Sequence, residues 1–308
     1  MDFESTAAHA VRAPIAAVSF TQRLEDYVAL TKPRVVSMVL LTTGAGFYLA
    51  RPDAPALLPL LHVLLGTALA AGGTLGLNQY LERDLDARME RTRRRPLPDG
   101  RLGSGEVMAV SGTMLAGGLL YLAFLSNLPA ALFTAAIAII YLGAYTPMKR
   151  RSALCSIVGA VPGALPPVVG WVAAQGTVDP LAWVLFAIMF LWQIPHSLAL
   201  ARLYRDDYAR AGIQVLPVID RDGPSTGRHV AVNCLALLPI GLLPTLIGVA
   251  GPAYFLVALA LGATFLWTGV QLAWSDTAAK ARRVLVVSLV YLPVLFTALM
   301  LDRYPIGR

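Results

Sequence analysis

Nine long apolar segments, separated by short polar loops, constrain the fold of this chain more than any other feature of its sequence. A helix that spans a bilayer needs about 20 mostly apolar residues, with a range of about 17–25. Segments of this kind repeat almost from one end of the chain to the other, and we predict a membrane-spanning helix in each. They cover residues 35–50, 56–81, 107–125, 128–147, 154–175, 180–200, 229–249, 252–275 and 284–301.

The distribution of lysine and arginine supports this number of spans and predicts their orientation. Of the 25 Lys and Arg residues, 22 lie before the first segment or in every second loop after it, and Arg51, Arg303 and Arg308 are the exceptions. Because basic residues favour cytoplasmic loops, the pattern predicts a cytoplasmic N-terminus and a C-terminus on the outside. Adding or removing one span would destroy the alternation.

The composition agrees with a membrane protein. The chain has 308 residues, of which 57% are hydrophobic and 14% charged, against about 25% charged residues in soluble domains. Its net charge of +7 does not indicate nucleic acid, because the basic residues lie in short loops that suit anionic headgroups. Cys155 and Cys234 fall in apolar segments without metal-site spacing, so neither a disulfide framework nor a zinc site is expected.

These features predict an all-α, polytopic fold with nine helices bundled around a central cavity. We expect one transmembrane domain over residues 28–302, a flexible cytoplasmic segment over residues 1–27 and a short tail over residues 303–308. The first 27 residues lack the pattern of a signal peptide. We therefore expect the inner (plasma) membrane of a bacterium.

The second apolar segment ends in a polar stripe that suggests a metal site. Asn78, Glu82 and Asp86 are spaced i, i+4, i+8, which places them on one face of a helix at its cytoplasmic end. Carboxylate and amide oxygens suit Mg²⁺, which usually leaves positions open for phosphate oxygens. Arg91 and Arg95 follow and could bind the phosphate. The alternative is a helix end whose charges simply reach water.

A second acidic cluster follows the sixth segment. Tyr204, Arg205, Asp206 and Asp207 lie together at the same side of the membrane. Asp207 and Asp206 could hold a second metal ion or position the first, and Arg205 could neutralise phosphate. Alone, the cluster is more typical of a solvated helix end. Its pairing with the first motif favours the opposite wall of one site.

Three further signals lie near these motifs. Lys149 and Arg150 form a basic loop on the same side, which either obeys the topology rule alone or captures phosphate. Lys32 is interpreted as a topology anchor. His196, near the end of the sixth segment, is either a packed helix residue or a contact for a ligand. Pro162 and its neighbours interrupt the fifth segment, whose backbone should then face protein or a cavity.

The string NQYLERDLDARMERTRRRPL, Asn78 to Leu97, resembles the first aspartate-rich motif of the UbiA superfamily of intramembrane prenyltransferases, and specifically its protohaem IX farnesyltransferase branch. That branch has Glu at the position of Glu82, followed by Met-x-Arg-Thr and Arg-Pro-Leu. The strings from Trp192 and from Tyr145 resemble the same branch. Two departures are Cys155, where Asn is common, and Ser197, where an aromatic residue is usual. The resemblance runs from about Leu30 to Asp302.

The resemblance implies Mg²⁺-dependent transfer of a farnesyl group from farnesyl diphosphate to a vinyl group of haem B, giving haem O and pyrophosphate. It also implies the partners: the lipid bilayer, and haem A synthase or terminal oxidase assembly proteins that receive the product, with no nucleic acid. The residues expected to hold metal are Asn78, Glu82, Asp86, Asp206 and Asp207, and those expected to bind the diphosphate are Arg91, Arg95, Tyr145, Lys149, Arg150, Tyr204 and Arg205. His196 is expected to contact haem.

Three other functions fit parts of this pattern. A prenyltransferase could act on another aromatic acceptor or another tetrapyrrole. A secondary transporter also uses many helices and broken segments, but its ionisable groups usually lie near the midplane, whereas these cluster at one end. An assembly factor that only passes haem onward would need no magnesium site.

Overall fold

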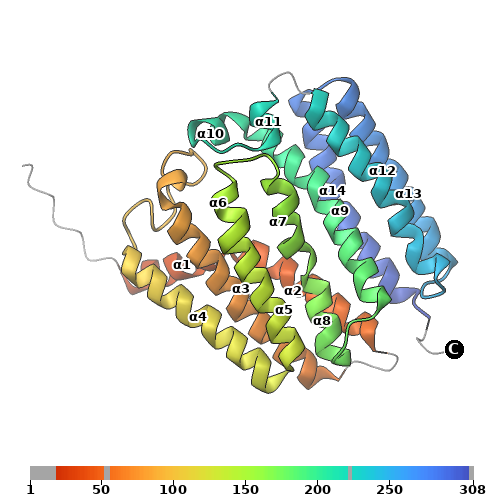
Figure 1. Cartoon of the computed structure of the whole chain (residues 1–308), viewed down its shortest axis with the longest axis horizontal. Helices are drawn as coiled ribbons and strands as arrows, with labels where there is room; N and C mark the ends of the chain where they lie inside the picture. The colour runs from red at the N-terminus through yellow and green to blue at the C-terminus, as the bar shows by residue number, and fades with distance from the viewer. Residues whose placement is uncertain (1–18, 52–55, 221–223, 305–308) are drawn as a thin grey trace, which may run out of the picture.

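The computed structural model describes residues 19–51, 56–220 and 224–304, and within them the chain folds into an all-helical bundle (Figure 1). The expected C-terminal tail from residue 305 and the first 18 residues lie outside the described part. The helices are α1 (Phe20–Thr31), α2 (Pro33–Ala50), α3 (Leu57–Asp86), α4 (Ser104–Leu125), α5 (Leu128–Ile139), the π-helix η1 (Ile140–Tyr145), α6 (Thr146–Met148), α7 (Cys155–Ala164), α8 (Pro166–Gln175), α9 (Pro180–Leu203), α10 (Arg205–Arg210), α11 (Leu216–Ile219), α12 (Pro224–Leu246), α13 (Pro252–Trp274) and α14 (Ala278–Leu301).

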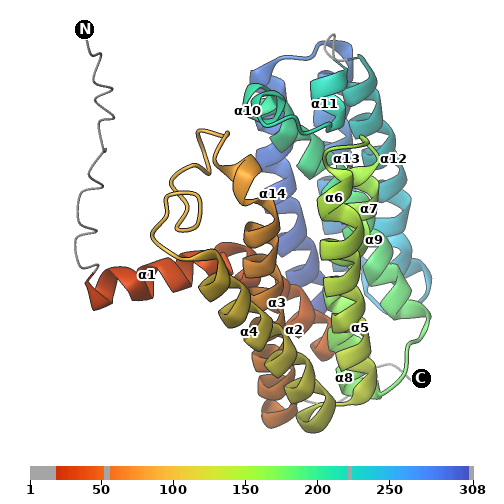
Figure 2. The ribbon, with the colours of Figure 1, turned by 60° about the vertical axis from the view of Figure 1, so that its left-hand side comes forward.

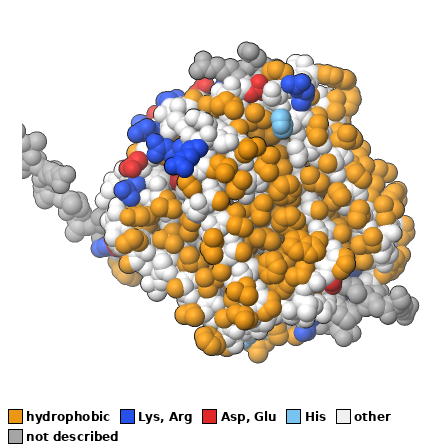
Figure 3. All heavy atoms as spheres, in the orientation of Figure 1, with side chains coloured by type: hydrophobic (Ala, Val, Ile, Leu, Met, Phe, Trp, Pro, Cys, Tyr) orange, Lys and Arg blue, Asp and Glu red, His pale blue; other side chains and the backbone are white. Residues whose placement is uncertain are grey.

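Nine spans in the described residues are long and apolar enough to cross a membrane, as the sequence predicted. The helices of the two halves of the chain lie side by side, and hydrophobic side chains cover much of the face shown in Figure 3. Several boundaries differ from the prediction, because polar residues extend helices past their apolar core. The last span begins at Ala278 instead of residue 284, and the side chain of Thr277 caps it by accepting a hydrogen bond from the backbone N–H of Lys280 (3.3 Å).

One end of the bundle gathers most of the basic residues, and we call it the basic end. It contains the C-terminal ends of α3 and α9, the segment after α6, helix α10 and the start of α14. Helix α3 has 30 residues and is therefore about 45 Å long at 1.5 Å per residue, longer than the hydrocarbon core of about 30 Å. Its last turns, from Asn78 onward, accordingly reach the basic end.

Helix α1 lies across the bundle instead of along it (Figure 2). The segment over residues 1–27 is expected to be flexible, but its part from Phe20 onward belongs to helix α1. Phe20, Leu24 and Val28 form an exposed stripe at four-residue spacing, while Asp26 faces inward and pairs with Arg101. One face of α1 is therefore exposed, and the opposite face packs on the protein. The inward contact anchors the chain just before the first span.

The fifth span is broken, as its prolines predicted. Helices α7 and α8 meet at Leu165, and α8 begins with Pro166 at its N-terminus. Glycines let α8 pack directly on the backbone of α2: a Cβ atom at Gly170 would lie 1.8 Å from the carbonyl oxygen of Thr43, and one at Gly46 would lie 2.0 Å from that of Pro167. The two glycines therefore allow the backbones of α2 and α8 to lie in direct contact.

We expect Gly170→Ala to destabilise the protein by about 1–3 kcal/mol, because the new methyl group forces α2 and α8 apart. The matched control is Gly117→Ala in α4, where an added Cβ meets nothing within 4 Å. The measurement is the thermal unfolding midpoint of both variants in detergent. Equal midpoints for both variants would contradict the role assigned to this contact.

Candidate active site

A polar cavity of about 150 Å³ lies at the basic end of the bundle. Its walls come from the α1–α2 junction, the end of α3 with the segment after it, η1 and the segments around α10. The lining residues are Lys32, Asn78, Glu82, Asp86, Met89, Arg91, Arg95, Tyr141, Tyr145, Lys149, Tyr208, Ile213 and Val215. Four of them are basic and two are acidic, so the wall carries an excess of positive charge.

The stripe on α3 supplies the oxygen atoms of the cavity. Asn78, Glu82 and Asp86 are all buried, with 1%, 7% and 1% of their surface exposed. Their spacing of four residues aligns them on one face of the helix. This confirms that they share a face, and it shows that the face turns into the protein instead of into open water.

A basic side chain contacts each of these three residues. Lys149 Nζ lies 2.6 Å from Glu82 Oε1, and Arg95 Nη1 lies 2.7 Å from Asp86 Oδ2. Lys32 Nζ donates a hydrogen bond to Asn78 Oδ1 at 3.2 Å. Because buried charges need partners, these contacts explain how two carboxylates can lie so close together in the interior.

Lys32 reaches the cavity through an unusual backbone conformation. It has φ 50°, the one positive φ at a non-glycine residue in the described part of the chain, and Pro33 follows it. Gln79 Nε2 donates to the carbonyl oxygen of Leu30 at 2.6 Å and so fastens the end of α1 to α3. Burial, with the positive charges of Arg95 and Lys149, lowers the pKa of Lys32 to about 7. The cavity thus holds more cations than its own carboxylates balance.

The π-helix η1 forms the next wall. Asn78 Nδ2 donates to Thr146 Oγ1 at 3.1 Å, and that hydroxyl donates to the carbonyl oxygen of Tyr141 at 2.8 Å. Tyr141 and Tyr145 contact each other with ring centroids 5.1 Å apart, and both line the cavity. π-Helical turns are frequent at functional sites, and this one directs two tyrosines to one side.

Lys149 is held from several directions. Its Nζ lies 4.4 Å from the ring centroid of Tyr145, and its carbonyl oxygen accepts a hydrogen bond from the backbone N–H of Gln214 at 2.7 Å. Burial alone would lower the pKa of its ammonium group, but Tyr145 and the Glu82 carboxylate outweigh burial and raise this pKa above its usual value. Lys149 therefore stays charged at neutral pH.

The second acidic segment packs against the end of the first. The backbone N–H of Glu90 donates to Asp207 Oδ1 at 3.4 Å, and Arg210 pairs with the same carboxylate. The guanidinium group of Arg91 lies 4.8 Å and 5.5 Å from the ring centroids of Tyr204 and Tyr208. An apolar cluster of Leu85, Met89, Ala211 and Ile213 lies beneath. The ends of α3 and α9 thus come together, as the sequence predicted.

Not every residue singled out from the sequence lines this cavity. Arg150 is exposed, and Asp206 is exposed and lies 3.9 Å from Arg205. Tyr204 contacts Arg91 but does not line the cavity, and neither Arg205 nor Asp207 is among the lining residues. Arg205, Asp206 and Asp207 follow a break in the helix at Tyr204, which turns α10 away from the axis of α9.

His196 also lies outside the cavity. Its Nδ1 is 2.8 Å from Ser288 Oγ of α14, and its ring stacks on Trp192 with centroids 5.0 Å apart. Trp192 Nε1 donates to the carbonyl oxygen of Ser288 at 2.8 Å. His196 therefore belongs to the contact between α9 and α14.

Sequence reasoning missed three polar lining residues, Lys32, Tyr141 and Tyr208, besides the apolar Met89, Ile213 and Val215. Lys32 was interpreted as a topology anchor, although its position directly before a proline at a helix start was a signal for a fixed backbone. Tyr141 precedes Tyr145 by four residues, so helical spacing would have placed both on one face. No comparable signal distinguishes Tyr208 from its neighbours.

The oxygen atoms of the cavity fit a hard divalent cation. Two carboxylates and one amide oxygen lie on one face of α3 over about two turns, and Mg²⁺ typically uses one or two carboxylates. Among the described residues, no group of three His, Cys, Asp or Glu side chains is arranged as a metal site by itself. The arrangement therefore suits a cation that brings other oxygen ligands with it.

The ion pair of Lys149 and Glu82 can be tested without any ligand, through its effect on stability. Both side chains are largely buried, and removing one partner of a buried pair costs about 3 kcal/mol or more because the other charge is left without compensation. We expect Lys149→Met to lower the unfolding midpoint in detergent and Lys149→Met/Glu82→Gln to recover most of the loss. A double variant no more stable than the single one would contradict this pairing.

Comparison with known proteins identifies relatives over nearly the whole chain. Residues 39–298 match the UbiA prenyltransferase family. A protohaem IX farnesyltransferase of Solibacter usitatus is 45% identical and covers 91% of this chain and 99% of its own length. Another of Koribacter versatilis is 46% identical, with 91% and 94% covered.

Solved structures share the fold at low sequence identity. A digeranylgeranylglyceryl phosphate synthase gives a TM-score of 0.77 at 15% identity, covering 91% of this chain and 98% of its own. A UbiA homologue from Archaeoglobus fulgidus bound to GPP and Mg²⁺ gives 0.62 at 18% identity, with 89% and 99% covered. By sequence and by fold, this multi-span membrane protein belongs to the UbiA prenyltransferase family.

Proposed function

We propose that the chain transfers a farnesyl group from farnesyl diphosphate to a vinyl group of haem B, forming haem O and pyrophosphate. The observation that carries this proposal is the cavity in which the oxygens of α3 face four basic side chains at the end of an apolar bundle. An isoprenoid diphosphate matches this arrangement, because its apolar tail suits the bundle and its anionic head suits the basic cavity. The acceptor is taken from the relatives, which are protohaem IX farnesyltransferases.

Asn78, Glu82 and Asp86 would hold Mg²⁺, with Asp207 as a further ligand from the second segment. Such a metal would supply charge stabilisation to the leaving pyrophosphate. Lys149 and Arg95, which pair with Glu82 and Asp86, are placed to bind phosphate oxygens beside it. Arg91 and Lys32 also line the cavity and add positive charge on the same wall.

The chemical step breaks the C–O bond of the allylic diphosphate. The basic side chains stabilise charge that develops on the leaving oxygens. The vinyl group supplies the electron pair for the new C–C bond, and water then adds to the resulting cation with loss of a proton. Tyr141 and Tyr145 border the site, and their rings limit access of bulk water before the acceptor is in place.

His196 is proposed to contact haem. Its Nδ1 is held by Ser288, which leaves Nε2 as the ring nitrogen that can face a ligand. We further propose that the basic end is cytoplasmic in a bacterial inner membrane, and that product passes to haem A synthase or to terminal oxidase assembly. Arg150, Arg205, Tyr204 and Asp206 remain proposed contributors at the edge of the site.

The overall reaction has a direct test. Membranes containing the chain are incubated with farnesyl diphosphate and haem B, with and without Mg²⁺, and the product is identified by mass. We expect a haem that carries a hydroxyethylfarnesyl group, formed only with Mg²⁺ present. Prenylation of a different acceptor would favour another prenyltransferase activity, and haem binding without pyrophosphate release would favour an assembly factor.

Loss of the α3 carboxylates should abolish most turnover. We expect Glu82→Gln and Asp86→Asn each to reduce kcat by at least ~10², the scale of a lost charge-stabilising group. Asp84→Asn is the control, because Asp84 lies on the same helix with its side chain 81% exposed. Near-normal turnover in both site variants would defeat the metal assignment.

A pair of variants can separate a role of Lys32 in ligand binding from its role in membrane topology. We expect Lys32→Met to weaken binding of farnesyl diphosphate about tenfold, the effect of losing one contact worth about 1.4 kcal/mol. Arg34→Met removes a nearby positive charge that does not line the cavity, and its affinity should stay close to that of the wild type. The measurement is a titration of each variant with the diphosphate in the presence of Mg²⁺. An equal loss in both variants would indicate a general charge effect.

A further inference from the structure

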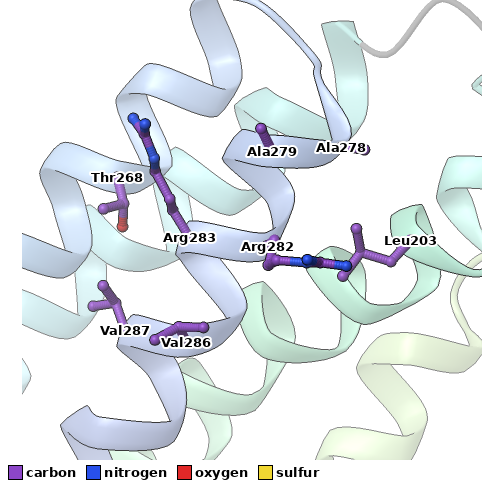
Figure 4. Close-up of a pocket in the computed structure, with 8 residues that line it drawn as sticks. All are labelled: Leu203, Thr268, Ala278, Ala279, Arg282, Arg283, Val286 and Val287. Atoms are coloured by element: carbon purple, nitrogen blue, oxygen red, sulfur yellow. The ribbon is translucent and has the colours of Figure 1, made fainter.

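A second hollow, larger than the candidate active site, opens at the basic end between α9, α13 and α14. It has a volume of about 720 Å³, within the range of about 300–1,000 Å³ typical of small-molecule sites. Its walls include Leu203, Val286 and Val287, and its polar groups include Arg282 and Arg283 (Figure 4). We call it the arginine groove.

The two arginines differ from most basic residues around them. Arg202 pairs with Asp276 at 2.6 Å, and Arg95 and Lys149 pair with carboxylates of α3. Arg282 and Arg283 are exposed, and no residue of the described part of the chain forms an ion pair or hydrogen bond with either. Figure 4 shows Arg282 directed toward Leu203 of α9 and Arg283 on the side of Thr268 of α13. The groove thus offers two separate guanidinium groups above an apolar wall.

The groove lies close to the acidic segment that follows α9. Leu203 is the last residue of α9, and Asp207 of α10 follows four residues later. Four residues span at most about 14 Å even when fully extended. The end of α9 is therefore shared, with the arginine groove on one side and the acidic segment on the other.

His196 lies deeper along the same contact. It precedes Leu203 by seven residues, which is two helical turns and about 10 Å of rise. Its partner Ser288 directly follows Val287 of the groove wall on α14. A ligand seated in the groove would meet the arginines at its outer edge, and the contact between His196 and Ser288 lies below it.

We propose that the arginine groove binds the acceptor substrate through its two propionate carboxylates, with Arg282 and Arg283 as their partners. This rests on the proposed function, which supplies haem as the acceptor. Haem has two carboxylates on one half of an apolar macrocycle and its vinyl groups on the other half. Binding the propionates at the bundle end directs the vinyl groups along α9 and α14, into the bundle.

The test is a haem titration of the full chain in neutral phosphatidylcholine vesicles, followed by the Soret absorption. We expect Arg282→Gln/Arg283→Gln to weaken binding of haem B about tenfold, and Arg282→Lys/Arg283→Lys to restore most of it. Arg228→Gln is the control, because Arg228 is an exposed basic residue of α12 that does not line the groove. Binding of farnesyl diphosphate should be unchanged in all variants.

The dimethyl ester of haem B identifies the group that is recognised. Because the ester has no carboxylates, it should bind wild type and the double Gln variant equally. An effect of the variant that is as large for the ester as for haem B would overturn the proposal. Unchanged haem B affinity would also overturn it, and so would a loss seen only when anionic phosphatidylglycerol is added, which would assign the groove to lipid headgroups.

The outcomes for the site and for the overall function are separable. If wild type forms farnesylated haem while the double Gln variant binds haem B normally, the propionate site is wrong and the proposed function stands. If haem B binds with the expected dependence on both arginines but no prenylated product forms, the reaction is wrong and the site stands.

Discussion

Charge compensation at the end of α3 is the interaction on which the rest of the site depends. Two buried carboxylates within one helical turn repel each other, and burial would make each unfavourable without a cation. Lys149 and Arg95 provide those cations. The same basic groups are the ones a diphosphate would need, so the contacts that stabilise this fold also preorganise the groups for ligand binding.

Departures from regular helix geometry concentrate around this cavity. Lys32 has a left-handed backbone, η1 is π-helical, and α9 breaks at Tyr204. Each departure redirects side chains that a straight helix would place elsewhere. Such local irregularities usually mark functional or strained sites. The spans α4 and α13, which supply no residue of this cavity, continue without a comparable interruption, and the break between α7 and α8 is the main departure that lies outside it.

The sequence predicted those features that depend on local periodicity. Span number follows from apolar length, and the shared face of Asn78, Glu82 and Asp86 follows from four-residue spacing. It did not predict the place of Lys32, because this depends on the fastening of α1 to α3 through Gln79 and Leu30. Nor did it separate Asp206 from Asp207, since adjacent helix residues point in different directions and only packing against Glu90 decides which one turns inward.

The corner between α9 and α10, at Tyr204, explains how one bundle can bind two unlike substrates. A prenyl donor needs an apolar channel with a metal-binding mouth, whereas a large planar acceptor does not fit within a cavity of about 150 Å³. Placing the acceptor in a separate groove solves this difference in size, provided that both sites share a wall. The end of α9 is such a wall, because Leu203 faces the groove while Asp207 contacts the segment after α3. Changes to this corner should therefore alter how the two substrates meet more than how tightly either one binds.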